Sequence, residues 1–261
     1  MICKASMVSL MAQTFVILAA GFGSRLNQLP SSIPKALIKL RNRPIIDFAL
    51  DNIANYLPEI KTTIIITGYK KKLIEEYVEL NASKYSFDLH CVYALDYKKG
   101  NGKSLSAAEF YVNDRFFLAM CDHLFEAPHY HTIKLESDRE TDLSLCIDFT
   151  PNSHIQLEDA TKVFTDSENN ILRIGKNLST WTAIDTGLFC LSPCVFKRLK
   201  QVSGKNVSVT DGVNQMIRHG DCVKGVDVSG SFWADIDTLT DLKNVEVYLS
   251  ADESSRESEG E

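Results

Sequence analysis

The feature that most constrains this chain is an apolar run that ends directly in two closely spaced glycines. Residues 15–20 read FVILAA, which is too continuous for a half-exposed strand and is typical of a strand buried on both faces. Gly21 and Gly23 follow at once. Because glycine lacks a Cβ atom, it permits positive φ and lets backbone N–H groups approach a phosphate closely. The segment therefore predicts a buried strand followed by a phosphate-binding loop.

Further apolar runs alternate with amphipathic segments, as in βαβ units. The alternation is regular up to about residue 121 and loosens afterwards, where turns separate several short strands. This pattern predicts one α/β domain with a Rossmann-like fold: a mixed, mostly parallel sheet, helices on both faces and a small antiparallel insertion. The predicted strands are 15–20, 62–67, 89–95, 115–121, 143–149, 160–164, 171–174, 183–191 and 222–228, and the predicted helices are 44–55, 70–80, 104–112, 194–201, 209–219 and 237–248.

The two ends of the chain differ in composition from the part between them. We expect a short N-terminal extension over residues 1–13, in which Met7 or Met11 is an alternative start, a domain over 14–249, and an acidic disordered tail over 250–261. No run of about 18 apolar residues occurs, so we expect no direct membrane insertion. The formal net charge is −6, from 28 Lys and Arg against 34 Asp and Glu, so no basic field indicates a nucleic-acid partner.

The cysteines indicate the redox compartment. The chain has seven, an odd number, and they are scattered without a CxxC pair or a neighbouring cluster of histidines. Several lie inside apolar runs, so buried reduced thiols are favoured over a zinc site or a disulfide framework. The sequence therefore predicts a cytoplasmic protein. The cysteines are Cys3, Cys91, Cys121, Cys146, Cys190, Cys194 and Cys222.

Two cations follow the glycine pair closely. Arg25 lies within LAAGFGSRL and Lys35 within PKAL, and together with the loop they can hold a nucleotide triphosphate and offset the charge on leaving pyrophosphate. The spacing matches neither the Walker A pattern nor GxGxxG, because position 26 is Leu and no Gly-Lys-Ser/Thr follows. A dinucleotide-dependent oxidoreductase is therefore disfavoured.

Carboxylates and a donor-rich loop supply further candidates. Asp122 closes a predicted buried strand at its carboxyl end, where open α/β sheets bind ligands and where a carboxylate facing a triphosphate suits Mg²⁺. The late segment WADIDT adds Asp235 and Asp237, although Asp237 also stands where a helix cap would be expected. The loop KGNGKS at 99–104 offers hydrogen-bond partners for a nucleobase, and a turn with an N-cap is its alternative interpretation.

The order of these blocks resembles a known family. LAAGFGSRL followed by PKAL is similar to the nucleotidyltransferases that join a nucleoside triphosphate to a phosphorylated sugar or alcohol and release pyrophosphate. The later blocks KGNGKSL, DRFFLAMCDHLFE, DATKVF, ILRIGKNL, AIDTGLFCL and FWADIDT occur in the order expected for the CTP:inositol-1-phosphate cytidylyltransferases, across residues 14–249. The resemblance implies a nucleotidyltransferase domain that uses Mg²⁺ to transfer a cytidylyl group from CTP to inositol-1-phosphate, giving CDP-inositol and pyrophosphate.

The resemblance also assigns roles residue by residue. It implies nucleotide binding by the glycine loop and by KGNGKS, which faces the base and favours cytosine, and acceptor binding by IGKNL and by the DTG segment. It makes Asp235 a direct metal ligand and Asp237 a ligand or a neighbour of one. The implied residues are Arg25, Lys35 and Lys176 for catalysis; Leu18, Ala19, Ala20, Gly21, Gly23, Ser24, Asn101, Gly102 and Ser104 for the nucleotide; Asp122, Asp235 and Asp237 for the metal; and Lys176, Asp185, Thr186 and Gly187 for the acceptor.

Departures from the family pattern leave the acceptor open. PKAL replaces the commoner PKPL, Cys121 stands where Gly usually precedes the Asp, and Asn177 where Asp follows the Lys. The alternatives to inositol-1-phosphate are phosphocholine, another alditol phosphate or a sugar-1-phosphate. A regulatory nucleotide-binding module without catalysis is disfavoured because the charged groups are retained. Some family members are fused to a membrane phosphotransferase; here we expect that step in a separate protein, and the sequence does not predict the oligomeric state.

Overall fold

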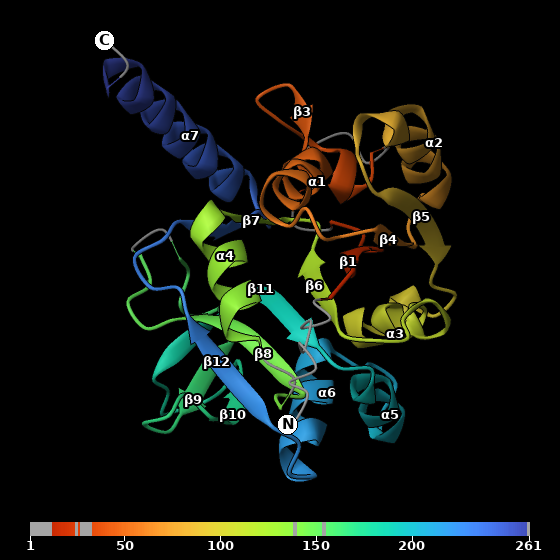
Figure 1. The fold of residues 1–261 in the computed structure, drawn as a ribbon, viewed down its shortest axis with the longest axis vertical. Coiled ribbons are helices and arrows are strands. Elements are labelled where there is room, and N and C mark those ends of the chain that lie inside the picture. Colours follow the sequence, from red (N-terminus) through yellow and green to blue (C-terminus); the bar gives the residue numbers. More distant parts are fainter. Residues whose placement is uncertain (1–11, 24–25, 27–32, 138–139, 153–154, 260–261) are drawn as a thin grey trace, which may run out of the picture.

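The computed structural model describes residues 12–23, 26, 33–137, 140–152 and 155–259, and side chains as far as Ala251. The described chain forms a nine-stranded sheet with helices on both faces, flanked by two small two-stranded sheets (Figure 1). Ser24, Arg25 and nearly all of the expected N-terminal extension lie outside the described residues, so their predicted roles stay predictions. No described helix is long and apolar enough to cross a membrane.

The first half of the chain builds a parallel arrangement around its first strand. The central strand β1 (Thr14–Ala19) pairs in parallel with β4 (Thr62–Thr67) on one side and with β6 (Phe116–Met120) on the other. Strand β5 (Asp88–Tyr93) extends the sheet beyond β4, again in parallel. All four strands consequently end at one edge of the sheet, where the loops that follow them meet.

The second half adds antiparallel pairings, as the sequence predicts. Strand β11 (Ala183–Leu191) pairs antiparallel with β6, with β8 (Leu143–Asp148) and with β9 (Lys162–Thr165), which in turn pairs with β10 (Ile171–Gly175). Strand β12 (Val223–Asp227) runs parallel to β8. The predicted α/β fold with a mixed sheet is thereby confirmed.

Side-chain alternation along the central strand divides the core into two layers. Phe15 and Ile17 belong to one buried cluster, whereas Val16 and Leu18 belong to another on the opposite face of the sheet. Each cluster is completed by helices that cover that face (Figure 1). The first face carries α1 (Ile45–Tyr56), α2 (Lys71–Asn81) and α4 (Ala127–Glu136), and the second carries α3 (Asn101–Ser106), α5 (Cys194–Gln201) and α6 (Val209–Arg218).

Short elements position the segments next to the sheet edge. Strand β7 (His123–Phe125) pairs antiparallel with β13 (Trp233–Asp235), so that Asp235 stands opposite His123. Strands β2 (Lys39–Leu40) and β3 (Arg43–Pro44) form the second small sheet. The 3₁₀ turns are η2 (Lys35–Leu37), η3 (Ala82–Lys84), η4 (Tyr97–Lys99) and η5 (Glu109–Tyr111).

Three helices differ from the sequence prediction. Helix α4 is not predicted, because its residues APHYHTIKLE carry only a weak apolar periodicity. The predicted helix at 104–112 is split into α3 and η5. Helix α7 (Leu239–Glu259) continues past residue 248 and projects from the body (Figure 1), so the segment that we expected to be a disordered tail is helical as far as Glu259. No Gly or Pro interrupts the sequence between Leu239 and Gly260, which allows the helix to propagate.

One buried histidine in α4 has no hydrogen-bond partner among the described residues. His129 is fully buried, and neither of its ring nitrogens is paired. Its ring lies 5.3 Å from that of Phe125, centroid to centroid. Burial disfavours the charged imidazolium and lowers the pKa of His129 to about 4. The folded protein therefore holds this side chain neutral at pH values at which the unfolded chain is protonated.

We expect the contribution of His129 to lower the free energy of unfolding as the pH drops below 6.5, because the unfolded chain binds a proton at this residue and the folded chain binds it only near pH 4. At about pH 5.5 the contribution of His129 to this loss is about 1 kcal/mol. His129→Phe should remove that contribution, whereas His131→Phe, a change at an exposed histidine of the same helix, should retain it. Urea unfolding at two pH values measures the difference, and equal acid sensitivity in His129→Phe and the unsubstituted protein would contradict the assignment.

Candidate active site

A cavity of about 740 Å³ opens at the carboxyl ends of β1 and β6. This is the edge at which open α/β sheets bind their ligands. Most of the residues singled out from the sequence share its wall, although they come from segments far apart in the chain. These are Leu18, Ala19, Ala20, Gly21, Lys35, Asn101, Ser104, Asp122, Lys176, Asp185, Gly187, Asp235 and Asp237.

Three other predicted residues do not line the cavity. The amide of Gly102 donates to the carbonyl of Val207 (2.9 Å), and a Cβ at Gly102 would lie 2.6 Å from a backbone oxygen of Ser208. Thr186 is fully buried and its hydroxyl donates to the carbonyl of Cys146 (3.1 Å). Gly23 has a φ of +62° and packs against Lys35. In this structure the three residues pack against other parts of the chain and do not line the cavity.

The loop that we predict to face the nucleobase is tied to the start of α6. Gly100 has a φ of +104° and lies so close to Val207 that a Cβ would be 2.3 Å from its carbonyl oxygen. Asn101 accepts a hydrogen bond from the amide of Val209 through Oδ1 (2.9 Å). These contacts hold Asn101 and Ser104 at the cavity wall, so two glycines of the motif serve close packing of backbone against backbone.

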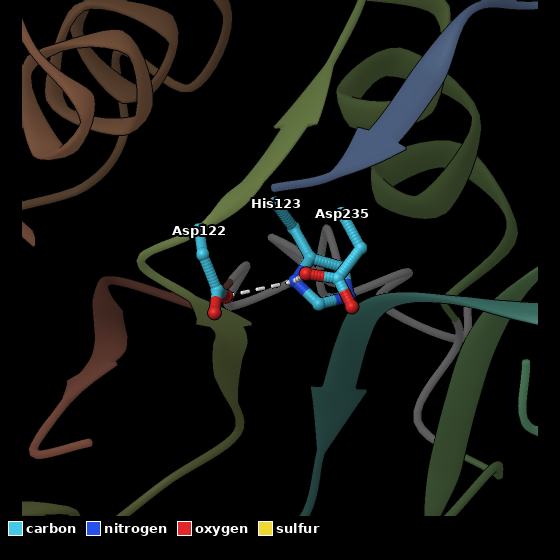
Figure 2. Close-up of side chains that lie close together, drawn as sticks. All are labelled: Asp122, His123 and Asp235. Atoms are coloured by element: carbon cyan, nitrogen blue, oxygen red, sulfur yellow. Dashed lines mark hydrogen bonds and ion pairs between the residues drawn. The ribbon is translucent and has the colours of Figure 1, made fainter. Parts of the chain in front are cut away.

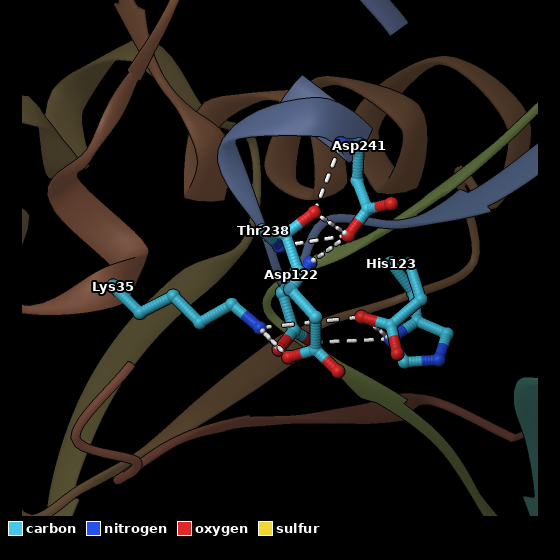
Figure 3. Close-up of polar contacts among 7 residues, drawn as sticks. Lys35, Asp122, His123, Thr238 and Asp241 are labelled. Carbon is cyan, nitrogen blue, oxygen red and sulfur yellow. Dashed lines mark hydrogen bonds and ion pairs between the residues drawn. The ribbon is translucent and has the colours of Figure 1, made fainter. Parts of the chain in front are cut away.

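The central feature of the cavity is a buried ammonium among carboxylates. Lys35, on η2, bonds with Asp122 and with Asp237 (2.7 Å) and lies 4.0 Å from Oδ1 of Asp235 (Figure 3). Its side chain is only 8% exposed. Burial opposes the charge, but the three carboxylates outweigh it and raise the pKa of Lys35 well above its usual range. The lysine is therefore a fixed cation at the centre of the site.

Asp237 does not cap α7, which was its alternative interpretation. The cap is formed by Thr238 and Asp241, because the Asp241 carboxylate accepts from the amide of Thr238 (2.7 Å) and the Thr238 hydroxyl accepts from the amide of Asp241 (3.2 Å) (Figure 3). The Asp237 carboxylate turns to Lys35 instead. Its predicted role as a metal ligand stays a prediction.

His123 is a member of this cluster to which the sequence assigned no catalytic role. Its Nδ1 lies 3.0 Å from Oδ1 of Asp122 and 3.9 Å from Oδ1 of Asp235 (Figure 2). Burial lowers the pKa of His123, but Asp235 and Asp122 outweigh it and raise the pKa to about 9. The signal available in the sequence was its position directly after Asp122 at the end of a buried strand.

The donor set fits a divalent cation. Burial raises the pKa of Asp235 to about 6, against the lowering effect of His123, and its Oδ1 is buried without a hydrogen-bond partner among the described residues. Burial also opposes ionisation of Asp122, but Lys35 and His123 hold the pKa of this carboxyl well below its usual range. In proteins Mg²⁺ is commonly held by one or two carboxylates together with substrate phosphates and water. Asp122 and Asp235 are thus suited to hold one.

Two of the predicted acceptor residues, Asp185 and Gly187, lie beside His123, and Lys176 lines the same cavity. Asp185 is held by the amide of Gly187 (2.8 Å), and burial raises the pKa of Asp185 to about 6. Gly187 has a φ of +90°, and a Cβ there would lie 2.4 Å from the ring of His123. Lys176 directly follows β10 and is exposed at the rim. The cavity also includes Gln156, which no sequence pattern singled out, and Asp159, which begins the DATKVF block but was assigned no role.

The chain belongs to the nucleotidyl transferase family, whose profile matches residues 14–251. Among curated proteins it is similar to a bifunctional IPC transferase and DIPP synthase of Aquifex aeolicus, with 29% identity over 92% of this chain and 52% of that protein. A protein of the same description from Thermococcus kodakarensis is 30% identical over 90% of this chain and 50% of its own length. The chain thus spans about half the length of these relatives.

Solved structures share the fold. The inositol-1-phosphate CTP transferase from T. maritima superposes with a TM-score of 0.80 at 23% identity, covering 92% of this chain and 96% of that one. A UDP-glucose pyrophosphorylase complexed with UDP-glucose superposes with a TM-score of 0.76 at 15% identity, covering 93% of this chain and all of the other. The Rossmann-like nucleotidyltransferase fold inferred from the sequence is therefore confirmed.

Replacing Lys35 should destabilise the fold, because it leaves three carboxylates close together without their shared ammonium. We expect Lys35→Met to lower the free energy of unfolding by about 3 kcal/mol near neutral pH. Adding Asp122→Asn to Lys35→Met should recover part of the loss, since one of the unpaired charges is then removed. Lys39→Met, at an exposed lysine on β2, is the matched control. If urea unfolding gives equal values for Lys35→Met and Lys39→Met, the carboxylates do not depend on this ammonium.

Proposed function

We propose that this chain transfers a cytidylyl group from CTP to inositol-1-phosphate with the help of Mg²⁺, giving CDP-inositol and pyrophosphate. The observation that carries the proposal is a single cavity that is lined by the predicted nucleotide, metal and acceptor residues together. Its wall combines the strand end Leu18–Gly21, Lys35 and the Asp122–Asp235 pair with Lys176 and Asp185. A nucleotide and a phosphorylated polyol are the substrates that such a cavity suits.

The relatives support the choice of branch within the family. Those with the most similar sequences among the ones described above carry an IPC transferase in their names, and the T. maritima protein is described as an inositol-1-phosphate CTP transferase. The KGNGKSL and IGKNL segments resemble those expected of that branch, with Asn177 in place of the usual Asp. Other relatives, such as the GlmU proteins of Methanococcus maripaludis, are similar at 27% identity. An acceptor other than inositol-1-phosphate is therefore the alternative.

The reaction needs placement and charge compensation rather than a general base. A phosphate monoester has a second pKa of about 6, so the acceptor is mostly a dianion at neutral pH. One of its oxygens forms a bond to the α-phosphorus of CTP, and the bond from that phosphorus to the β-phosphate oxygen breaks. Pyrophosphate leaves with the electron pair of that bond, and no proton is transferred. Positioning and electrostatics therefore account for the catalysis.

Each charged side chain has a part in this scheme. Lys35, held by Asp122 and Asp237, presents a fixed positive charge to the phosphates. Lys176 at the rim attracts the acceptor phosphate, and Arg25 offsets charge on the leaving pyrophosphate. Asp122 and Asp235 would hold Mg²⁺, which when bound neutralises charge on the triphosphate. The absence of a Ser-His-Asp or Cys-His arrangement at the described site is consistent with a direct displacement.

The decisive measurement is pyrophosphate release with Mg²⁺, in which each nucleoside triphosphate is tested against inositol-1-phosphate, phosphocholine, glycerol-3-phosphate and glucose-1-phosphate. We expect release with CTP and inositol-1-phosphate alone. Release with a different acceptor would still identify a nucleotidyltransferase, but it would overturn the assignment to the inositol-1-phosphate branch of the family.

As a control, Asp122→Ala should lower turnover by about a hundredfold or more while the circular dichroism spectrum is retained. A chain that binds CTP but releases no pyrophosphate with any acceptor would be a binding module.

Lys176→Ala should raise the KM for the acceptor about tenfold or more and lower kcat, because a contact to a charged group contributes about 1.5–3 kcal/mol. The affinity for CTP, measured by calorimetry, should change little, since we propose that Lys176 contacts the acceptor phosphate and not the nucleotide. Lys205→Ala, at an exposed lysine that does not line the cavity, is the matched control. Unchanged acceptor kinetics in Lys176→Ala would remove this residue from the acceptor site.

We propose that the protein works in the cytoplasm and that a separate protein consumes its product. Six described cysteines are free, and burial raises the pKa of several of them, including Cys121, Cys146 and Cys190, as expected for inert thiols in a reducing compartment. CDP-inositol is an activated polyol, so a separate membrane phosphotransferase is the proposed consumer of the product.

A further inference from the structure

Three donor atoms from two short strands converge on one point of the cavity wall. The Nδ1 atom of His123 lies 3.0 Å from Oδ1 of Asp122 and 3.9 Å from Oδ1 of Asp235 (Figure 2). One ligand atom from each of the three residues falls within 4.8 Å of the other two. Donors about 2.1 Å from a metal at neighbouring coordination positions lie about 3 Å from one another. The 3.0 Å separation of Nδ1 from Asp122 matches two neighbouring positions around one cation, and Asp235 lies somewhat farther out, within the 4.8 Å that bounds all three atoms.

The structure fixes the imidazole in this place by contacts on several sides. The pairing of β7 with β13 sets Asp235 directly opposite His123. The ring packs where the missing Cβ of Gly187 leaves room, since that atom would be 2.4 Å from the ring. The side chain is 14% exposed. A ring held in this way keeps its nitrogen aimed at the two carboxylates.

Lys35 and His123 use different oxygens of the same carboxylate. The ammonium of Lys35 bonds with Oδ2 of Asp122, whereas Nδ1 of His123 faces Oδ1 (Figure 3). The buried Oδ1 of Asp235 has no hydrogen-bond partner among the described residues. Lys35 thus contacts one oxygen of Asp122, whereas the other oxygen lies with His123 Nδ1 and Asp235 Oδ1 in one group of potential metal ligands.

We propose that His123 is a third protein ligand of the divalent cation, which gives the site a preference for Mn²⁺ and Co²⁺ over Mg²⁺. This inference rests on the cation site of the proposed function and concerns which metal ion that site prefers. Carboxylate and water ligands suit Mg²⁺ and Mn²⁺, but imidazole nitrogen favours transition metals, and Mn²⁺ accepts both kinds of donor. Imidazole binds a metal as the neutral ring, so the cation and the Nδ1 proton occupy the same position between the carboxylates.

A purely structural histidine makes a different prediction. If His123 only holds Asp122 in position by a hydrogen bond, its replacement weakens binding of every divalent cation to the same degree. If it is a ligand, its replacement by an oxygen donor weakens Mn²⁺ much more than Mg²⁺. The ratio of the two dissociation constants separates the two roles, and it requires no turnover.

The experiment measures Mn²⁺ binding to the full chain by electron paramagnetic resonance without nucleotide, with Mg²⁺ as competitor. We expect His123→Gln to weaken Mn²⁺ binding about tenfold or more, with a much smaller change for Mg²⁺. Electron spin-echo modulation from bound Mn²⁺ should show a directly coordinated nitrogen, which His123→Gln should abolish. His123→Asn provides a second, shorter oxygen donor, and His131→Gln is the matched control at an exposed histidine.

Nitrogen modulation that persists in His123→Gln and His123→Asn, or is absent from the unsubstituted protein, would overturn the inference, as would an unchanged ratio of the two dissociation constants. These outcomes are independent of the proposed function. Nitrogen-coordinated Mn²⁺ without pyrophosphate release on any substrate pair would retain the ligand assignment and reject the transferase. CTP turnover without nitrogen coordination would retain the transferase and reject the assignment.

Discussion

The arrangement of the site depends on one ammonium group, that of Lys35, buried among carboxylates from two other parts of the chain. Asp122 follows the fourth parallel strand, and Asp235 and Asp237 come from the end of the domain, yet all three face the same nitrogen. Three carboxylates so close together would repel one another strongly without a cation between them. Lys35 thus connects the 3₁₀ turn η2, the end of β6 and the segment after β13 into one structure.

Parallel pairing and close packing around glycines bring the rest of the site to this cation. Strands β1, β4 and β6 end at the same edge because they are parallel, so the glycine loop and Asp122 meet there. Gly100 and Gly187 allow approaches that a Cβ would block, the first to the backbone of Val207 and the second to the ring of His123. The cavity wall therefore depends on these two glycines as much as on the charged residues.

Prediction succeeded where local signals agree. The β-branched segment TTIIIT at 62–67 is typical of a strand, and the prediction matches β4 residue for residue. Helix α6 is likewise predictable from the sequence, because it has a strong apolar face and begins with a capping box formed by Ser208 and Asp211. Helix α4 was missed because its buried side chains include His129 and Tyr130, which periodicity rules treat as polar or ambiguous. The length of α7 was missed because an acidic composition resembles that of disordered tails.

The sequence by itself determined the class of fold, the family and the identity of most charged residues in the cavity, because these are carried by continuous segments such as LAAGFGSRL and WADIDT. Only the tertiary structure decided which of these residues act together. It placed Asp237 on Lys35 and gave the helix cap to Thr238 and Asp241, and it brought His123 between two carboxylates. The physical reason is that a side chain's partner depends on strand register and packing over a hundred residues or more of separation, which local pattern does not encode.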